Sequence, residues 1–326
     1  MPVPYVRPDV QMMLDLLAAQ EGPKTHETDP ATARAMMDMV FTMAELPAGE
    51  LGIKRDFTIP GPAGDIPARL YDPRDSREPG PVVVFYHGGG FVIGNIETHD
   101  GLCAETARTL DLPVVSVDYR LAPEDPFPAA PEDCIAAARW IATSPDELGL
   151  SVTGLVPAGD SAGGNLAAVT SLALRDEAAD VPVVAQWLIY PATDMGADSG
   201  SMVDFAEGFL LESATMDWFS NHYAGDAADW RLNPVLQDTA GLPPTVLVTA
   251  GLDPLRDQGR EYAGKLIAGG VQTVYREAAG NIHGFANLRK MIPSAHDDVM
   301  ACLRALNAIL DELKAESQTE QAAAAE

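Results

Sequence analysis

The stretch LVPAGDSAGGNLAAV, residues 155–169, decides the fold of this chain. An apolar run leads into Gly159-Asp160-Ser161-Ala162-Gly163, and a helical pattern follows. G-x-S-x-G between a strand and a helix is typical of a nucleophile elbow, a turn so sharp that the flanking positions tolerate little beyond glycine. Such a turn exposes a hydroxyl at the top of a sheet, beside a helix N-terminus that favours an oxyanion. Ser161 is therefore the candidate nucleophile.

Around this stretch, short apolar segments alternate with helical patterns. Runs such as PVVVFY (81–86) and PTVLVTA (244–250) are apolar on both faces, as strands buried in a parallel sheet are. The alternation predicts an α/β fold, with a mainly parallel sheet covered by helices and an antiparallel hairpin before it. We expect hairpin strands at Asp56–Ile59 and Ile66–Tyr71, further strands at Val82–Tyr86, Val114–Val117, Gly154–Ala158, Val184–Tyr190, Thr245–Ala250 and Gln272–Glu277, and helices at His99–Leu110, Ala130–Thr143, Gly163–Leu174, Leu255–Ala268 and Ala295–Lys314.

Two segments stand outside this rhythm. Residues 7–46 have helical periodicity, with an Asp29-Pro30 helix start, and residues 194–233 contain no strand but many methionines and aromatics. An insertion of this length in an α/β pattern usually forms a lid. We therefore expect a helical cap from residues 1–48 and 194–233, a core from residues 49–193 and 234–315, and a tail at 316–326, which we expect to be a frayed helical end.

A glycine-rich loop follows the first strand of the parallel sheet, in the sequence His87-Gly88-Gly89-Gly90-Phe91. Three consecutive glycines are costly for stability, and they make sense where backbone N–H groups must approach a ligand closely. An HGGG loop supplies oxyanion donors in lipases and esterases. We predict an oxyanion hole formed by the N–H groups of Gly88, Gly89 and Ala162, with His87 as an orienting donor. A phosphate-binding loop is the alternative, but no G-K-[ST] follows and the net charge opposes it.

A serine nucleophile needs a base, and the base needs a carboxylate; in this fold their chain order is Ser, acid, His. Asp253 follows the run TVLVTA, and His283 follows the last expected strand. Both are expected on loops at the carboxyl ends of strands, where open α/β sheets keep their sites. Asp257 is the rival acid, but it falls inside a helix, and Asp160 is expected to brace the elbow. The other histidines, which we expect to be surface or packing residues, are His26, His99, His222 and His296.

The motifs HGGGF, GDSAGG, DPLRD and HGF, in this order, resemble the bacterial hormone-sensitive-lipase-like carboxylesterases of the α/β-hydrolase superfamily, in the GDSAG branch. The resemblance extends from about residue 51 to residue 314. It implies an eight-stranded, mostly parallel sheet with a helical cap, and hydrolysis of short- to medium-chain carboxylic esters without a cofactor or metal. Carried over by position, it makes Ser161 the nucleophile, His283 the base, Asp253 its partner, and Gly88, Gly89 and Ala162 the oxyanion hole. The chain departs from the family pattern at Gln258 and Asn281.

The composition limits the partners. The 326 residues carry 21 Lys+Arg against 48 Asp+Glu, a net charge of −27, which repels nucleic acid and anionic membrane surfaces and would suit a saline habitat. Three scattered cysteines fit neither a disulfide framework nor a zinc site. We see no signal peptide and no apolar run of about 18 residues, so we expect a cytoplasmic protein. The edge strand near Gln272–Glu277 could pair across a homodimer.

Three functions remain compatible with this sequence. The first is a serine esterase acting on a small-molecule ester, for which we predict acyl chains up to about octanoyl, in keeping with an apolar cap. The second is a binding protein similar to the plant gibberellin receptors, which lack the triad histidine that this chain retains as His283. The third is acyl transfer or amide cleavage, because both reactions share the acyl-enzyme step with ester hydrolysis. The sequence leaves the physiological ester and the oligomeric state open.

Overall fold

A computed structural model describes residues 4–19, 21–198 and 200–324 of the chain. Its centre is one eight-stranded sheet of order β1-β2-β4-β3-β5-β6-β7-β8. The pairs β1–β2 and β2–β4 are antiparallel, and all the others are parallel. The predicted eight-stranded, mostly parallel α/β fold is therefore confirmed. The strands are β1 Ile53–Gly61, β2 Gly64–Asp72, β3 Gly80–Tyr86, β4 Val114–Val117, β5 Val152–Asp160, β6 Gln186–Ile189, β7 Thr245–Leu252 and β8 Thr273–Ile282.

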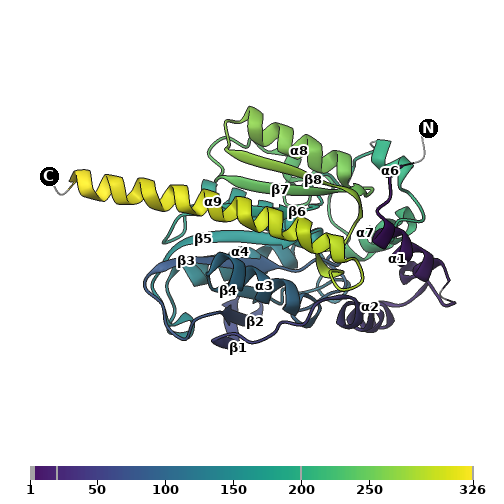
Figure 1. The fold of residues 1–326 in the computed structure, drawn as a ribbon, viewed down its shortest axis with the longest axis horizontal. Helices are drawn as coiled ribbons and strands as arrows, with labels where there is room; N and C mark the ends of the chain where they lie inside the picture. Colours follow the sequence, from purple (N-terminus) through teal and green to yellow (C-terminus); the bar gives the residue numbers. More distant parts are fainter. Residues whose placement is uncertain (1–3, 20, 199, 325–326) are drawn as a thin grey trace.

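Helices cover both faces of this sheet (Figure 1). α3 and α9 pack together over one face, while α4, α5 and α8 cover the other. In Figure 1, α9 runs across the sheet and its C-terminal part projects beyond the body of the molecule. The helices are α1 Pro8–Ala18, α2 Pro30–Ala44, α3 Asp100–Leu110, α4 Ala129–Ala142, α5 Ala162–Asp176, α6 Gly200–Asp204, α7 Ser213–Tyr223, α8 Arg256–Ala268 and α9 Pro293–Ala324, with short 3-10 helices at η1 Thr25–Glu27, η2 Glu97–His99, η3 Asp146–Leu148, η4 Pro234–Leu236 and η5 Phe285–Asn287.

The doubly apolar strands divide the core into two. On β3, Val82 and Val84 belong to the cluster that includes α4 and α5 side chains. Their neighbours Val83 and Phe85 belong to the cluster under α3 and α9. Successive side chains of a strand point to opposite faces, so a run of apolar residues is required wherever helices cover both sides.

The candidate site lies at the carboxyl ends of the strands, where β7 and β8 are longer than the sequence predicts. β7 continues to Leu252 and β8 to Ile282, five residues beyond the predicted end of the last strand, and these two terminal residues pair with each other. Asp253 and His283 therefore leave the sheet side by side. β6 is shorter than predicted: the Val184 N–H donates to the Leu155 carbonyl outside the regular strand, and pairing with β7 begins at Gln186.

The N-terminal helices and the inserted segment lie at the same side of the molecule, where Figure 1 shows α1, α2, α6 and α7. Asp29 caps α2 by accepting from the Thr32 N–H at 3.0 Å, as the Asp-Pro pattern predicts. Lys24 forms an ion pair with Glu212 of the insertion at 2.7 Å. The described residues include no helix that is both long enough and apolar enough to span a membrane.

Candidate active site

The nucleophile elbow is built as the G-x-S-x-G pattern predicts. Ser161 lies between the end of β5 and the start of α5, with φ 56° and ψ −116°, a conformation that side-chain-bearing residues rarely adopt. A β-carbon at Gly159 would collide with the backbone of Gly163, and one at Gly163 would collide with the carbonyl of Tyr86. Both glycines are therefore required because three backbone segments meet here without room for side chains.

Ser161, His283 and Asp253 come together at the carboxyl edge of the sheet. His283 Nε2 lies 2.8 Å from Ser161 Oγ, and His283 Nδ1 lies 2.7 Å from Asp253 Oδ2. Asp253 is fully buried and its other oxygen accepts the Leu255 N–H at 2.8 Å. Because a carboxylate only accepts, Nδ1 carries the ring hydrogen and Nε2 presents a lone pair to the serine hydroxyl.

The rival acid lies elsewhere. Asp257 sits in the first turn of α8, where it accepts the Ser201 N–H at 2.9 Å and forms an ion pair with Arg256 at 2.8 Å. Nearby Gln258, one of the departures from the family pattern, accepts the N–H groups of Thr193 and Asp194 at 2.7 and 2.9 Å. These two side chains anchor the inserted segment to α8, whereas the carboxylate bonded to His283 is that of Asp253.

One predicted oxyanion donor is contradicted. The Gly88 N–H donates to Asp160 Oδ1 at 2.8 Å, inside the protein, so it has no free hydrogen for a substrate. Among the described residues, the N–H groups of Gly89 and Gly90 have no hydrogen-bond partner. Ala162 is the first residue of α5, so its N–H cannot be satisfied within the helix. The free N–H groups beside Ser161 are thus those of Gly89, Gly90 and Ala162, a set that differs by one glycine from the predicted one.

Asp160 braces the elbow, as predicted, but its main partner was missed. Its Oδ1 lies 2.9 Å from Nε2 of His99, a fully buried residue of η2. Burial favours the neutral carboxyl, but the charge and hydrogen bond of His99 and the Gly88 N–H outweigh it, so the pKa of Asp160 is lowered. Sequence reasoning treated His99 as a surface or packing residue, because a lone histidine at a helix start carries no signal of its partner.

His87 orients the glycine loop from within. Its Nδ1 lies 2.9 Å from the Gly88 carbonyl oxygen, and the Tyr119 ring stacks on it at 4.3 Å. Burial, followed by the charge of His99, lowers the pKa of His87 to about 3, so the ring is neutral. Its Nε2 has no hydrogen-bond partner within the part of the chain that the structure describes, and it faces Asp118 at 3.8 Å. His87 is therefore part of the loop's support, whereas the histidine that contacts Ser161 Oγ is His283.

Apolar residues of the inserted segment cover this edge. Phe219 of α7 packs so closely on Gly90 that a β-carbon there would collide with its ring. Leu210, which has φ 74°, lies over Gly284, directly after His283. A small apolar cluster joins the insertion to the loops beside the nucleophile and the acid. It comprises Ala192, Leu211 and Leu255, with Met202, Met216 and Phe219 packed against them.

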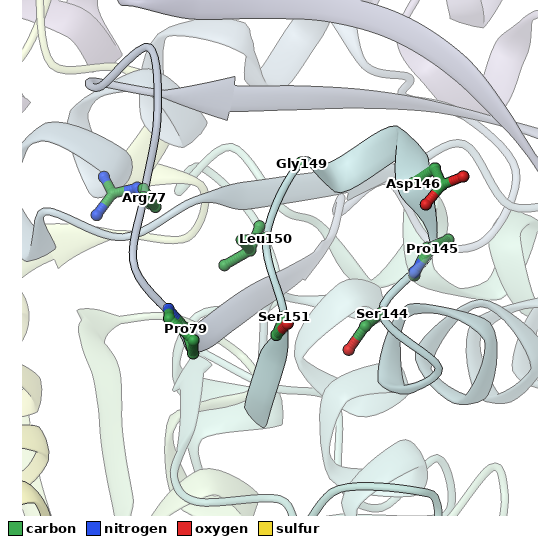
Figure 2. Close-up of a pocket in the computed structure, with 8 residues that line it drawn as sticks. All are labelled: Arg77, Pro79, Ser144, Pro145, Asp146, Gly149, Leu150 and Ser151. Carbon is green, nitrogen blue, oxygen red and sulfur yellow. The ribbon is translucent and has the colours of Figure 1, made fainter.

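A hollow of about 390 Å³ lies away from these residues, and Figure 2 shows the side chains that line it. It is bordered by the loop before β3 and the loop before β5, so it is at the opposite end of β5 from Ser161. Arg77, its only lining cation, is paired with Asp72 at 2.7 Å and with Asp111 at 3.2 Å, which leaves no free charge for a ligand. Its lining residues are Arg77, Pro79, Ser144, Pro145, Asp146, Gly149, Leu150 and Ser151.

An α/β sheet that brings a serine, a histidine and a buried aspartate together at its carboxyl edge defines the hydrolase class of this fold. The family model described as alpha/beta hydrolase fold matches residues 83–287. The chain belongs to this α/β hydrolase family, and the resemblance to hormone-sensitive-lipase-like carboxylesterases is confirmed.

Individual relatives and solved structures support the same family assignment. The chain is similar to the carboxylesterase NlhH of Mycobacterium tuberculosis, at 36% identity over 93% of this chain and 97% of that protein. It is 47% identical to the carboxylic ester hydrolase LipN of the same organism over 72% of this chain, a match that spans 64% of LipN, less than two thirds of its length. Among solved structures, an ester hydrolase from the metagenome of Lake Arreo superposes with a TM-score of 0.87 at 40% identity, over 93% of this chain and 98% of that one.

Proposed function

We propose that Ser161, His283 and Asp253 are the catalytic triad of a carboxylic ester hydrolase. The observation that carries the proposal is the pair of hydrogen bonds of 2.8 and 2.7 Å by which His283 connects Ser161 to Asp253. The protein is a serine carboxylesterase of the α/β hydrolase family. The same bonds argue against a receptor role, because the triad histidine is present and aligned with the serine.

Hydrolysis proceeds in two halves. In the first, His283 Nε2 takes the hydroxyl proton of Ser161 as Oγ attacks the ester carbonyl, and Asp253 stabilises the resulting imidazolium. The C–O bond to the alcohol then breaks, and His283 returns the proton to the leaving oxygen. In the second half, water attacks the acyl-enzyme with the same histidine as base, releasing the acid and restoring Ser161.

The negative charge that develops on the carbonyl oxygen needs fixed donors. We assign this role to the N–H groups of Gly89, Gly90 and Ala162, since they are free of partners within the described structure, whereas the Gly88 N–H is not. Removing one such donor typically costs about 100- to 1,000-fold in turnover. The N-terminus of α5, of which Ala162 is the first residue, adds a favourable dipole at the same point.

Residues 1–48 and 194–233 act as the cap that shapes the substrate site. Support comes from the Lys24–Glu212 ion pair, from the His26–Thr215 hydrogen bond of 3.2 Å, and from the apolar cluster on which Leu211 and Met216 meet Leu255. Because this apolar cluster lies close to Ser161 and Asp253, it favours a short apolar acyl group. A relative in Pseudomonas putida is named ethyl acetate hydrolase, which agrees with a small ester.

A chain-length series tests this function. Purified protein is assayed with p-nitrophenyl acetate, butyrate, octanoate and palmitate near pH 8, with Ser161→Ala as the blank. We expect turnover of the esters up to octanoate, none of palmitate, and none by the variant. Activity retained by Ser161→Ala would overturn the assignment of the nucleophile, and a preference for palmitate would overturn the short-chain site. Competition between water and an added alcohol distinguishes hydrolysis from acyl transfer.

Assembly and location are separate proposals. β8 is an edge strand of the sheet, which supports a homodimer in which two copies of β8 pair. Sedimentation velocity at micromolar concentration tests it, and a monomer there would contradict it. Cell fractionation tests the cytoplasmic location.

A further inference from the structure

A second histidine–aspartate pair lies directly beside the nucleophile. His99 Nε2 is 2.9 Å from Asp160 Oδ1, and Asp160 immediately precedes Ser161. Both residues are buried, His99 completely. The reaction described above does not use His99, so its place beneath the site needs another reason.

The contacts of His99 hold both nitrogens of its ring, and aromatic rings lie close to it. The Gly88 N–H lies 2.8 Å from Asp160 Oδ1 and 3.3 Å from His99 Nε2, so the three groups meet at one point. A carboxylate only accepts, so His99 Nε2 carries the hydrogen of its bond to Asp160. At the other end, Nδ1 lies 2.8 Å from the Thr98 hydroxyl. The rings of Phe41 and Phe85 lie 6.1 and 5.9 Å from the imidazole. Such a ring cannot rotate without breaking a buried hydrogen bond, so it fixes the position of Asp160.

Asp160 in turn fixes the glycine loop through a hydrogen bond to Gly88. Its Oδ1 holds the Gly88 N–H at 2.8 Å, and Gly88 is one residue before the first free oxyanion donor. Its other oxygen has only weak partners, Tyr190 OH at 3.3 Å and Asn287 Nδ2 at 3.4 Å. Without His99, these two contacts and Gly88 would have to hold a buried carboxylate, which is costly unless it is well hydrogen-bonded.

We propose that His99 is a positioning residue for ester hydrolysis, which holds Asp160 and through it aims the N–H groups of Gly89 and Gly90 at the oxyanion. This inference rests on the proposed function of those two donors. Oxyanion donors act within a narrow distance range of about 2.7–3.1 Å, and a misplacement of about 1 Å can cost roughly 100-fold in rate. The effect of losing His99 falls on the transition state, so it lowers kcat and leaves KM nearly unchanged.

The test uses three variants of His99. His99→Phe keeps an aromatic ring near Phe41 and Phe85 but has no donor. His99→Gln keeps an amide nitrogen in the place of Nε2, and His99→Asn keeps one in the place of Nδ1, which faces Thr98 and cannot reach Asp160. Thr106→Val is the control, because the buried Thr106 hydroxyl donates to the Leu102 carbonyl within its own helix, α3.

We expect His99→Phe and His99→Asn to lower kcat on p-nitrophenyl butyrate about 10- to 100-fold, with KM within about twofold of the wild type. The Ki of phenylboronic acid, which forms a tetrahedral adduct on the serine oxygen, should rise by the same factor. His99→Gln should recover most of both losses, and Thr106→Val should change neither. The Gln and Asn variants, both polar and of similar size, keep the comparison valid if the Phe variant does not fold.

The inference would be overturned by a kcat within twofold of the wild type for both His99→Phe and His99→Asn, or by a fall in kcat without a matching rise in the boronate Ki. Equal losses for Gln and Asn would also overturn it, since then the donor toward Asp160 would not matter. Failure of the proposed function is distinct: the wild type itself would hydrolyse no ester and would not bind the boronate.

Discussion

Replacing Ser161 by glycine should make the protein more stable than replacing it by alanine. Both variants lose the hydroxyl and its 2.8 Å contact with His283, so their difference isolates the backbone. The φ of 56° and ψ of −116° impose about 1–3 kcal/mol on a residue with a β-carbon, and glycine escapes this strain. Glycine also loses more conformational entropy on folding than alanine, which lowers the free energy of unfolding by about 0.5–1 kcal/mol. Taking the middle of each range, the net gain of Ser161→Gly over Ser161→Ala is about 1 kcal/mol.

Calorimetry can resolve a difference of this size. An unfolding entropy of about 2.1 cal/mol/K per residue amounts to roughly 0.7 kcal/mol/K for 326 residues, so Ser161→Gly should melt about 1–3 °C above Ser161→Ala. Ser171, inside α5, is the matched control, because there glycine should be about 1 kcal/mol less stable than alanine. A Ser161→Gly variant that melts at or below Ser161→Ala, while the Ser171 pair behaves as expected, would refute strain at the nucleophile.

Asp253→Asn should lower kcat by about 10,000-fold and Asp257→Asn by less than about tenfold, measured by steady-state kinetics; the reverse order would reassign the acid. Leu210 has φ 74° within a turn closed by the Leu211 N–H to the Phe209 carbonyl, so Leu210→Gly should raise the melting temperature relative to Leu210→Ala; a lower one would refute strain there. Burial raises the pKa of Asp118 to about 6, above its unfolded value, so the folded state binds the extra proton and stability falls as pH rises from about 4 to 6. Asp118→Asn should therefore stabilise the protein at pH 8 and hardly at pH 4.5 in urea titrations; an equal effect at both pH values would contradict this.

Much of the site could be predicted from local sequence. The elbow around Ser161 is a short-range object, because the two glycines and the serine define a turn whose geometry depends on a few neighbouring residues. The candidates Asp253 and His283 follow from the chain order of the fold and from their places after apolar strands. The rejection of Asp257 rested on the helix that contains it, and the structure indeed uses that carboxylate to hold the Ser201 N–H.

The end of the last strand and the free oxyanion donors depend on contacts between distant segments, so local sequence does not predict them. The last strand was predicted to end at Glu277, yet it continues to Ile282, because pairing with β7 satisfies backbone groups in a stretch whose Ala, Gly and Asn residues have no strand preference of their own. The Gly88 N–H was assigned to the oxyanion hole, and only the position of Asp160, 72 residues later, shows that it is already used.

The sequence by itself determined the α/β class, the family and the identity of the candidate nucleophile, acid and base. These depend on the period of apolar residues and on motifs in which every member is within a few positions of the next. Tertiary structure alone decided which backbone N–H groups remain free, that His99 is a partner of Asp160, and how the inserted segment covers the site. Those depend on which polar groups meet in space, and a hydrogen bond consumes its donor wherever in the chain its acceptor lies.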